Sequence, residues 1–272
     1  MGEYEEKSNN WLIKINIELE NLLRDTTIRS VLWCIRKCST IKEGISIEIK
    51  LAVFDIDGTL APTDDPITAQ VACKLRSLER QGIRIVFISG RTTSYLAGLA
   101  RGIGICQPLV AGENGGVIFE PLRKWEKKLE AIPHQVGEVM KQDLLKKFPD
   151  LWFQPNQTML TATPKDFSTV NLLYQAVQAL EPVKRNKYKI NRYDDCVEVM
   201  PKENSKGRAL AVVKEILGIR SEEVIVFGNT IVDLPMKDET NDFLMIGDAA
   251  AAEGISSYPC IEEALDYLES NL

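Results

Sequence analysis

Histidine is almost absent from this chain of 272 residues, which contains a single one, His134. The six cysteines lie far apart except for Cys34 and Cys38, and no nearby cysteine or histidine completes a zinc-binding set. We therefore expect no zinc site, no chemistry from His134, and six reduced thiols, as is typical of an intracellular protein.

Long apolar runs and basic tracts are also missing. No run reaches the ~18 apolar residues that a membrane-spanning helix needs, so we expect no membrane span. The polar, charged N-terminus shows no sign of a secretory signal peptide. A net charge of -6 argues against nucleic acid as a partner. The length suffices for a main domain and a smaller one, and we expect a cytoplasmic location.

The most informative segment is residues 51–60, which read LAVFDIDGTL. An apolar run predicts a buried strand, and it ends in Asp55 and Asp57, which lie on one side of an extended chain. Gly58 allows a tight turn and a close approach of the backbone to a ligand. Two neighbouring carboxylates repel each other unless a cation lies between them, and Mg²⁺ prefers such oxygen ligands. The segment indicates a magnesium and phosphate site, and a solvated Asp-x-Asp-Gly turn is the alternative.

Strands and helices alternate in the first part of the chain, which predicts a parallel sheet with helices on both faces. Right-handed crossovers place the carboxyl ends of the strands along one edge, so Asp55, Ser89 and Asn114 should meet in one crevice. The expected elements are strand 49–55, helix 66–81, strand 83–88, helix 92–102 and strand 108–111.

The pattern changes between residues 118 and 200, where helices and short strands indicate a small α+β domain. The expected elements there are helix 131–147, strands 151–162, helix 166–181 and strands 187–193 and 196–200. The earlier rhythm then resumes with helix 206–217, strand 223–228, helix 233–238, strand 243–246 and helix 261–270. We predict an α/β fold: a Rossmann-like, three-layer, parallel-sheet main domain (49–117 and 201–272) with an inserted α+β cap domain (118–200).

Residues 1–48 precede this pattern. Apolar residues at helical spacing predict two amphipathic helices, or one bent near residues 25–27, and a short strand over residues 13–19 is the weaker alternative. We expect the segment to pack against the main domain, with a homodimer contact as the alternative. Its polar face is mixed in sign, which argues against binding to a membrane surface.

Four segments together resemble the haloacid dehalogenase (HAD) superfamily of phosphohydrolases. They are Asp55-Ile-Asp57-Gly-Thr59, the strand end Ser89-Gly90-Arg91, Lys206-Gly-Arg-Ala-Leu210 at a helix start, and Gly228-Asn229 followed by Asp233. Gly112-Glu-Asn114-Gly-Gly116 narrows the resemblance. It is similar to the branch of archaeal phosphoglycolate phosphatases, sucrose phosphatases and related sugar-phosphate phosphatases, whose cap is inserted after that strand.

The resemblance implies a Mg²⁺-dependent phosphatase that hydrolyses a small phosphate monoester, phosphoglycolate or a sugar phosphate, through an aspartyl-phosphate intermediate. It assigns Asp55 as the nucleophile, Asp57 as the general acid/base, and Lys206 as the cation that offsets negative charge. The implied phosphate- and substrate-binding residues are Gly58, Ser89, Gly90, Arg91 and Asn114, with Glu113 beside Asn114 as a further substrate contact. The implied metal ligands are Asp55, Asp57, Asn229 and Asp233.

The fourth segment departs from the family pattern of Gly-Asp followed by Asn-Asp, because it reads Gly228-Asn229 and then Val232-Asp233. An amide oxygen can coordinate Mg²⁺ but carries no formal charge. Three alternatives follow: Asp233 replaces the missing ligand, the metal site is weaker, or the protein is a catalytically weak relative that binds phosphorylated ligands. A phosphotransferase or phosphomutase with the same nucleophile is another alternative. Asp248 is a further candidate ligand.

Substrate choice is expected to come from the cap. Five basic residues there could meet a second anionic group on the substrate. A solvated strand edge kept soluble by charge is the alternative, which we expect for most of them. The five are Lys184, Arg185, Lys187, Lys189 and Arg192.

Overall fold

The computed structural model describes residues 48–63, 65–185, 187–247 and 255–272. The helices or strand expected within residues 1–47, and the candidate Asp248, therefore lie outside the described residues. Among the described residues, no helix is long and apolar enough to cross a membrane.

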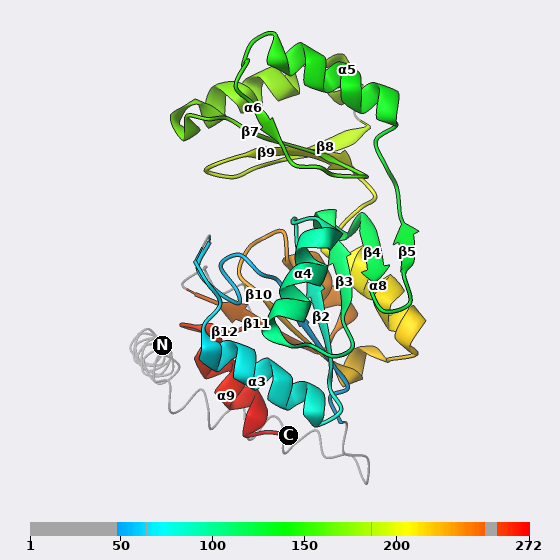
Figure 1. Ribbon diagram of the computed structural model, residues 1–272, viewed down its shortest axis with the longest axis vertical. Coiled ribbons are helices and arrows are strands. Elements are labelled where there is room, and N and C mark those ends of the chain that lie inside the picture. Colours follow the sequence, from blue (N-terminus) through cyan, green and yellow to red (C-terminus); the bar gives the residue numbers. More distant parts are fainter. Residues whose placement is uncertain (1–47, 64, 186, 248–254) are drawn as a thin grey trace, which may run out of the picture. The chain divides into compact units, whose positions relative to one another are not determined.

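Eight strands form the main sheet, in the order β12-β11-β10-β1-β2-β3-β4-β5 (Figure 1). Neighbouring strands from β12 to β3 are parallel, whereas β4 and β5 continue the sheet in antiparallel fashion. The strands are β1 (Leu51–Phe54), β2 (Arg84–Ile88), β3 (Leu109–Gly112), β4 (Val117–Glu120), β5 (Trp125–Lys128), β10 (Val224–Gly228), β11 (Asp242–Ile246) and β12 (Ser256–Tyr258).

Helices cover both faces of this sheet. Side chains alternate along β1, so Ala52 and Phe54 pack with α3, α4 and α9, while Leu51 and Val53 pack with α8. The predicted α/β class with a three-layer parallel-sheet domain is thereby confirmed. The helices are α3 (Ala69–Arg80), α4 (Thr93–Ile103), α8 (Lys206–Leu217) and α9 (Ile261–Glu269), with the 3-10 turns η1 (Glu113–Gly115), η3 (Ser221–Glu223) and η4 (Leu234–Glu239).

The start of α8 is set by a side-chain cap. The hydroxyl of Ser205 accepts a hydrogen bond from the backbone N–H of Arg208 at 3.0 Å, so the helix begins at Lys206. The helix ends at Gly218, whose φ of 65° is the left-handed conformation that favours glycine. Lys206 is therefore held in the first turn of a helix whose two ends are both defined by the local sequence.

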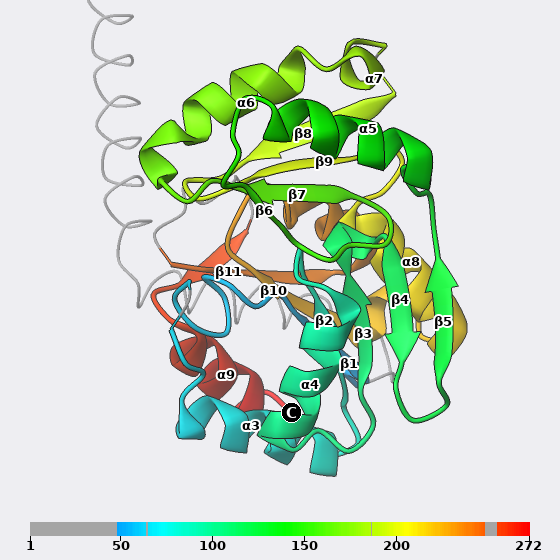
Figure 2. The same ribbon diagram turned by 45° about the horizontal axis from the view of Figure 1, so that its top comes forward.

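A second, antiparallel sheet has the order β6-β7-β9-β8. Helices α5 and α6 cover the face of this sheet that points away from the main sheet (Figure 2). Apolar side chains of these helices, among them Met140, Leu144 and Leu173, pack against the strands. The elements are α5 (His134–Leu145), β6 (Trp152–Phe153), β7 (Leu160–Thr163), η2 (Phe167–Thr169), α6 (Val170–Gln178), α7 (Glu181–Lys184), β8 (Tyr188–Arg192) and β9 (Val197–Pro201).

Two features of the fold differ from the expectation. The hairpin of β4 and β5 hydrogen-bonds to the main sheet, so residues 117–128 extend that sheet rather than opening a cap at residue 118. The strands expected over 151–162 are β6 and β7, and Pro155, which cannot donate a ladder hydrogen bond, lies between them. The helix expected over 233–238 is the 3-10 helix η4. The division into a catalytic domain and a substrate-selecting cap stays a prediction.

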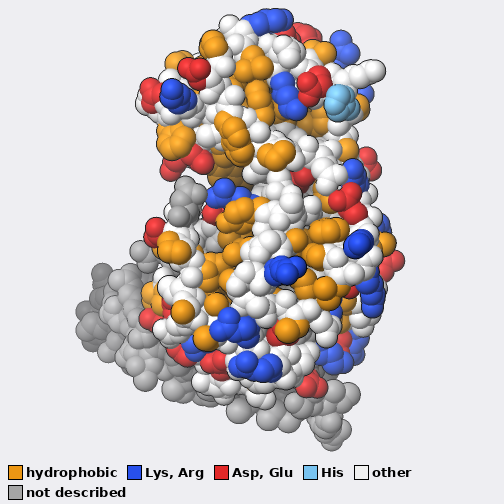
Figure 3. Space-filling model, viewed as in Figure 1, with side chains coloured by type: hydrophobic (Ala, Val, Ile, Leu, Met, Phe, Trp, Pro, Cys, Tyr) orange, Lys and Arg blue, Asp and Glu red, His pale blue; other side chains and the backbone are white. Residues whose placement is uncertain are grey.

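Basic and acidic side chains are interspersed on the described part of the face drawn in Figure 3. Apolar side chains also reach the surface there between the charged ones. This face therefore does not gather its lysines and arginines into a single basic patch.

Candidate active site

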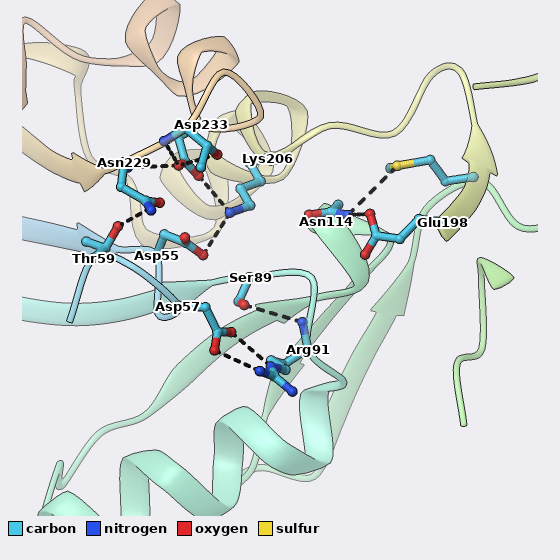
Figure 4. A network of polar contacts seen from close by, with 12 residues as sticks. Asp55, Asp57, Thr59, Ser89, Arg91, Asn114, Glu198, Lys206, Asn229 and Asp233 are labelled. Atoms are coloured by element: carbon cyan, nitrogen blue, oxygen red, sulfur yellow. Dashed lines mark hydrogen bonds and ion pairs between the residues drawn. The ribbon is translucent and has the colours of Figure 1, made fainter. Parts of the chain in front are cut away.

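The predicted motifs meet at the carboxyl ends of neighbouring strands of the main sheet (Figure 4). Asp55 follows β1, and its backbone N–H donates to the carbonyl of Phe227 on β10 at 3.0 Å. Ser89 follows β2, and its backbone carbonyl accepts from the N–H of Asn114, which follows β3, at 2.9 Å. The parallel strand order therefore collects these residues at one edge, as predicted.

Lys206 joins two of the predicted carboxylates. Its Nζ lies 2.7 Å from Oδ1 of Asp55 and 2.6 Å from Oδ1 of Asp233, and all three side chains are buried. Two buried carboxylates close together repel each other unless a cation lies between them. The ammonium of Lys206 supplies that cation within the protein itself.

The ionisation of this group follows from burial and from the ion pairs. Burial raises the pKa of Asp55 to about 6, while Lys206 opposes that rise and Asp233 adds to it. Burial alone would lower the pKa of Lys206, but the carboxylates of Asp233 and Asp55 outweigh it and raise that pKa. Burial alone would raise the pKa of Asp233, but Lys206 outweighs it and lowers that pKa. At neutral pH the site therefore holds charged Lys206 and Asp233 and a largely ionised Asp55.

Asp233 also organises the loop after β10. Its Oδ2 accepts hydrogen bonds from the backbone N–H groups of Asn229 at 3.0 Å and Thr230 at 2.9 Å, and from the Thr230 hydroxyl at 3.0 Å. Its Oδ1 accepts from Lys206. These contacts make Asp233 the residue that orients both the loop and Lys206, a role that the sequence analysis did not predict.

Asn229 packs against the first motif. The Thr59 hydroxyl donates to its Oδ1 at 3.3 Å. Gly58 has a φ of 80°, and a Cβ at that position would lie 1.9 Å from Nδ2 of Asn229, so only glycine allows this approach. The backbone N–H of Gly58 donates to the carbonyl of Ala61 at 2.7 Å. Gly58 thus makes room for Asn229, and its predicted part in phosphate binding stays a prediction.

Asp57 is paired with Arg91. The guanidinium donates from Nε to Oδ2 of Asp57 at 2.9 Å and from Nη2 to Oδ1 at 2.7 Å, which is a bidentate ion pair. The backbone N–H of Arg91 donates to Oγ of Ser89 at 3.3 Å. The Asp57 and Arg91 side chains are 27% and 34% exposed, so a ligand entering the site can reach both.

The donor atoms of the site fit a hard cation. Asp55 and Asn229 supply carboxylate and amide oxygens from adjoining strand ends, which are the atom types that Mg²⁺ prefers. The described residues contain no group of three or more His, Cys, Asp or Glu side chains arranged to hold a metal. A cation here would complete its coordination with water and phosphate oxygens, as Mg²⁺ commonly does. The donor set therefore fits Mg²⁺ held jointly by the protein and a phosphate group.

Glu113 differs from its predicted role as a substrate contact. Its side chain is 1% exposed, and its carboxylate accepts from the backbone N–H groups of Gln157 at 2.8 Å and Thr158 at 2.7 Å. The Thr158 hydroxyl donates to it as well, at 2.6 Å. The prediction for Glu113 was wrong: the carboxylate ties the end of β3 to the loop before β7, and its acceptor positions are taken up there.

Asn114 meets the second sheet at Glu198, a residue that the sequence analysis missed. The Asn114 Nδ2 donates to Oε2 of Glu198 at 2.8 Å, and the Nδ2 of Asn191 donates to the same oxygen at 3.2 Å. Burial raises the pKa of Glu198, and hydrogen bonds from its amide and phenol neighbours oppose that rise. Glu198 lies between two valines in a short strand. Because side chains alternate along a strand, this pattern predicts that Glu198 faces away from the apolar layer.

A pocket of about 200 Å³ adjoins this network and Lys206. The main-sheet part contributes Asn114, Lys206 and the apolar Val232 to its lining. The second sheet contributes Lys189, Asn191 and Met200. The pocket thus combines the buried lysine of the candidate site with side chains from both sheets.

Comparison with known proteins independently supports the resemblance to phosphatases. The model of the sucrose-6F-phosphate phosphohydrolase family matches residues 49–258. The phosphoglycolate phosphatase of Staphylothermus marinus is 27% identical over 210 residues, covering 74% of this chain and 86% of that protein. The phosphoglycolate phosphatase of Thermoplasma volcanium is 28% identical over 192 residues, covering 69% of this chain and 80% of that protein.

Solved structures show the same fold. A haloacid dehalogenase-like hydrolase from Bacteroides thetaiotaomicron superposes with a TM-score of 0.68 at 20% identity, covering 81% of this chain and 100% of that chain. A protein of Thermotoga maritima gives a TM-score of 0.64 at 18% identity, covering 80% of this chain and 97% of that chain. The family match spans all four motif segments. The chain therefore belongs to the sucrose-6F-phosphate phosphohydrolase family of the haloacid dehalogenase superfamily and is a phosphoric monoester hydrolase.

Proposed function

We propose that this protein is a Mg²⁺-dependent phosphatase that hydrolyses a small phosphate monoester through an aspartyl-phosphate intermediate. The observation that carries the proposal is the buried Asp55–Lys206–Asp233 ion-pair set beside Asp57. Two relatives named phosphoglycolate phosphatase support phosphoglycolate as a candidate substrate, and the family model supports sugar phosphates. The catalytic and binding roles of individual residues belong to this proposal.

In the first step an oxygen of Asp55 attacks phosphorus, and the bond between phosphorus and the leaving oxygen breaks. Asp57 gives that oxygen its proton, and general acid assistance of this kind is worth roughly 10²–10⁴ in rate. In the second step water attacks the phosphorus of the aspartyl phosphate and gives a proton to Asp57, the bond between phosphorus and the Asp55 oxygen breaks, and phosphate and the free Asp55 carboxylate result. Covalent catalysis by Asp55 divides one difficult hydrolysis into two easier steps.

The other residues act by position and charge, which supply most of the catalysis in phosphoryl transfer. Lys206 offsets the negative charge on Asp55 and on the phosphoryl group. The Ser89 hydroxyl and the backbone amide of Gly90 hold phosphate oxygens. Arg91 binds both oxygens of Asp57 in this structure, so the acid/base role requires Arg91 to release at least one of them when substrate enters.

Asp55 and Asn229 would hold Mg²⁺ together with phosphate oxygens, and the bound ion would supply positive charge that stabilises the negative charge of the phosphoryl group. Asp57 lies beside this position, and Asp233 supports it through the loop and Lys206. The neutral amide at 229 predicts weaker metal affinity than a carboxylate would give.

The test is hydrolysis of a panel of phosphate esters with Mg²⁺ and with EDTA, comparing wild type with Asp55→Asn. We expect phosphate release by wild type only with Mg²⁺, and none by the variant. The control is Asp143→Asn, which changes a carboxylate on α5 whose side chain is 47% exposed. Equal rates for wild type and Asp55→Asn would refute the role of Asp55.

A second candidate is a non-catalytic protein that binds phosphorylated ligands, which the neutral Asn229 and the apolar Val232 favour. A phosphotransferase or phosphomutase shares the nucleophile but passes the phosphoryl group to an acceptor other than water. Phosphate release separates the three, because a binding protein releases none and a mutase interconverts isomers with little free phosphate. The cytoplasmic location, the homodimer contact and the absence of nucleic-acid and membrane partners stay predictions.

A further inference from the structure

Strand β8 contributes one basic side chain, Lys189, to the lining of the pocket. Tyr188 and Ile190 pack into the apolar layer beneath α5 and α6. Because side chains alternate along a strand, Lys189 and Asn191 point to the opposite face, and both line the pocket. Of the five basic residues predicted as candidate contacts for a second anionic group, Lys189 is the one that lines this pocket. The other four are exposed.

Lys189 also differs from the surface lysines around it in its partners. Lys141, Lys146 and Lys184 form ion pairs with glutamates or aspartates three residues away in the sequence. Lys189 is half-buried, and it forms no ion pair with any residue that the structure describes. Its Nζ donates to the backbone carbonyl of Asn204. Burial lowers the pKa of Lys189, and the charges of Glu203 and Glu198 oppose that change without cancelling it.

The half-buried ammonium of Lys189 interacts at longer range with Glu203 and Glu198, but neither carboxylate forms an ion pair with it, so it is only partly compensated for the water that it has lost. An anionic group in the pocket would restore that compensation. The same pocket is lined by Lys206, which bonds to Asp55, so a molecule whose phosphate lies at Asp55 can extend towards Lys189. The lining also includes apolar side chains, among them Val232 and the 80% exposed Ile231. A volume of about 200 Å³ leaves room for a short carbon skeleton.

We propose that Lys189 binds a second anionic group on the leaving group of the substrate, which makes short phosphate monoesters bearing a carboxylate or a second phosphate the preferred substrate class. This inference rests on the proposed phosphatase function. It identifies Lys189 as a specificity-determining residue outside the motifs that carry the chemistry.

The experiment compares kcat/KM for three esters: 2-phosphoglycolate, 1,3-propanediol bisphosphate and ethyl phosphate. The first two carry a carboxylate and a phosphate as the second anion, and the third carries none. We expect wild type to prefer at least one of the first two over ethyl phosphate by tenfold or more. The better of the two identifies the anion.

Lys189→Gln keeps a donor for the Asn204 carbonyl and removes the charge. We expect it to reduce the preference over ethyl phosphate by about 10- to 100-fold, mainly through KM, as expected for a lost hydrogen bond to a charged group. Lys189→Arg should retain most of the preference. The matched control is Lys187→Gln, an exposed lysine two residues earlier, which should leave the preference within twofold of wild type.

The inference is overturned if wild type shows no preference for a second anion, if Lys189→Gln keeps the preference, or if Lys187→Gln loses it equally. If wild type cleaves none of the esters, the phosphatase proposal fails. Calorimetric binding of 2-phosphoglycolate to wild type and Lys189→Gln then tests Lys189 separately, and equal affinities would overturn its role. Lys189→Met repeats each comparison if the glutamine variant does not fold.

Discussion

Asn229 places a neutral amide where the family pattern has a carboxylate. At an effective dielectric constant near 20, two unit charges ~4 Å apart interact by about 4 kcal/mol before desolvation is counted. An amide dipole recovers only part of that attraction. We therefore predict that Asn229→Asp tightens Mg²⁺ binding and raises activity at limiting Mg²⁺, as measured by Mg²⁺ titration of activity and by calorimetry.

The control for this change is Asn241→Asp, the same substitution at an exposed residue before β11. It should leave the Mg²⁺ titration unchanged. If Asn229→Asp also leaves the titration unchanged, the loop after β10 does not hold the metal, and the assignment of Asn229 is wrong.

Asp233 engages both of its oxygens with Lys206 and the loop, and its side chain is fully buried. Removing one partner of a buried ion pair typically costs about 3–5 kcal/mol, because the other charge is left without compensation. We predict that Asp233→Asn lowers the free energy of unfolding by an amount of that order. It should also lower kcat, because Lys206 loses one of the two carboxylates that hold it.

Urea unfolding and steady-state kinetics check this prediction, with Asp238→Asn on the exposed side of η4 as the control. The double variant Asn229→Asp/Asp233→Asn separates the two roles of Asp233. If Asp233 were a metal ligand, the new carboxylate at 229 would restore Mg²⁺ binding and activity. If Asp233 positions Lys206, the double variant should remain as unstable and slow as Asp233→Asn.

At the scale of elements, the 3-10 turn η3 fastens the start of β10 to the residue before β1. The Glu223 carboxylate lies 2.7 Å from Nζ of Lys50 and accepts from the backbone N–H of Arg220 at 2.9 Å. The hydrogen bond from Lys50, followed by those from Arg220, lowers the pKa of Glu223 to about 2. In the unfolded chain a glutamate titrates at roughly 4.3.

Because the pKa of Glu223 is lower in the folded state, its stabilising contribution is present above about pH 4.3 and is lost as the pH falls towards 2. We predict that Glu223→Gln lowers Tm at pH 7 and that its Tm difference from wild type shrinks between pH 5 and pH 2. Thermal unfolding by circular dichroism checks this, with Glu215→Gln on an exposed position of α8 as the control. A difference that stays constant over that pH range would contradict the ion-pair assignment.

At the scale of the whole molecule, residues 48–272 form one compact unit. Every candidate site residue lies in this unit, and all of them except Asp248 are among the described residues. All described strands of both sheets lie within that unit. We therefore predict that deleting residues 1–46 leaves the specific activity of the soluble product largely intact. Steady-state assays and light scattering check activity and oligomeric state, and a folded truncation without activity would contradict the prediction.

Local patterns in the sequence were sufficient for the α/β class and for most element positions. Apolar runs that end in polar residues located the strand ends at Asp55, Ser89 and Asn229, because a buried parallel strand needs apolar side chains on both faces. Ser205 and Gly218 mark the ends of α8 by capping and left-handed backbone conformation. These signals depend on neighbours in the chain, so they can be read without the tertiary structure.

Only the tertiary structure decided which distant side chains pair. Arg91 lies against Asp57, Asp233 against Lys206, and Glu113 against the loop before β7. A strand pattern predicts the face on which a side chain lies, but a hydrogen bond needs two atoms within about 3 Å, which depends on the packing of elements far apart in the sequence. For the same reason the sequence offered five basic residues as candidate contacts for a second anionic group of the substrate. In the structure Lys189 lines the pocket, whereas the other four are exposed.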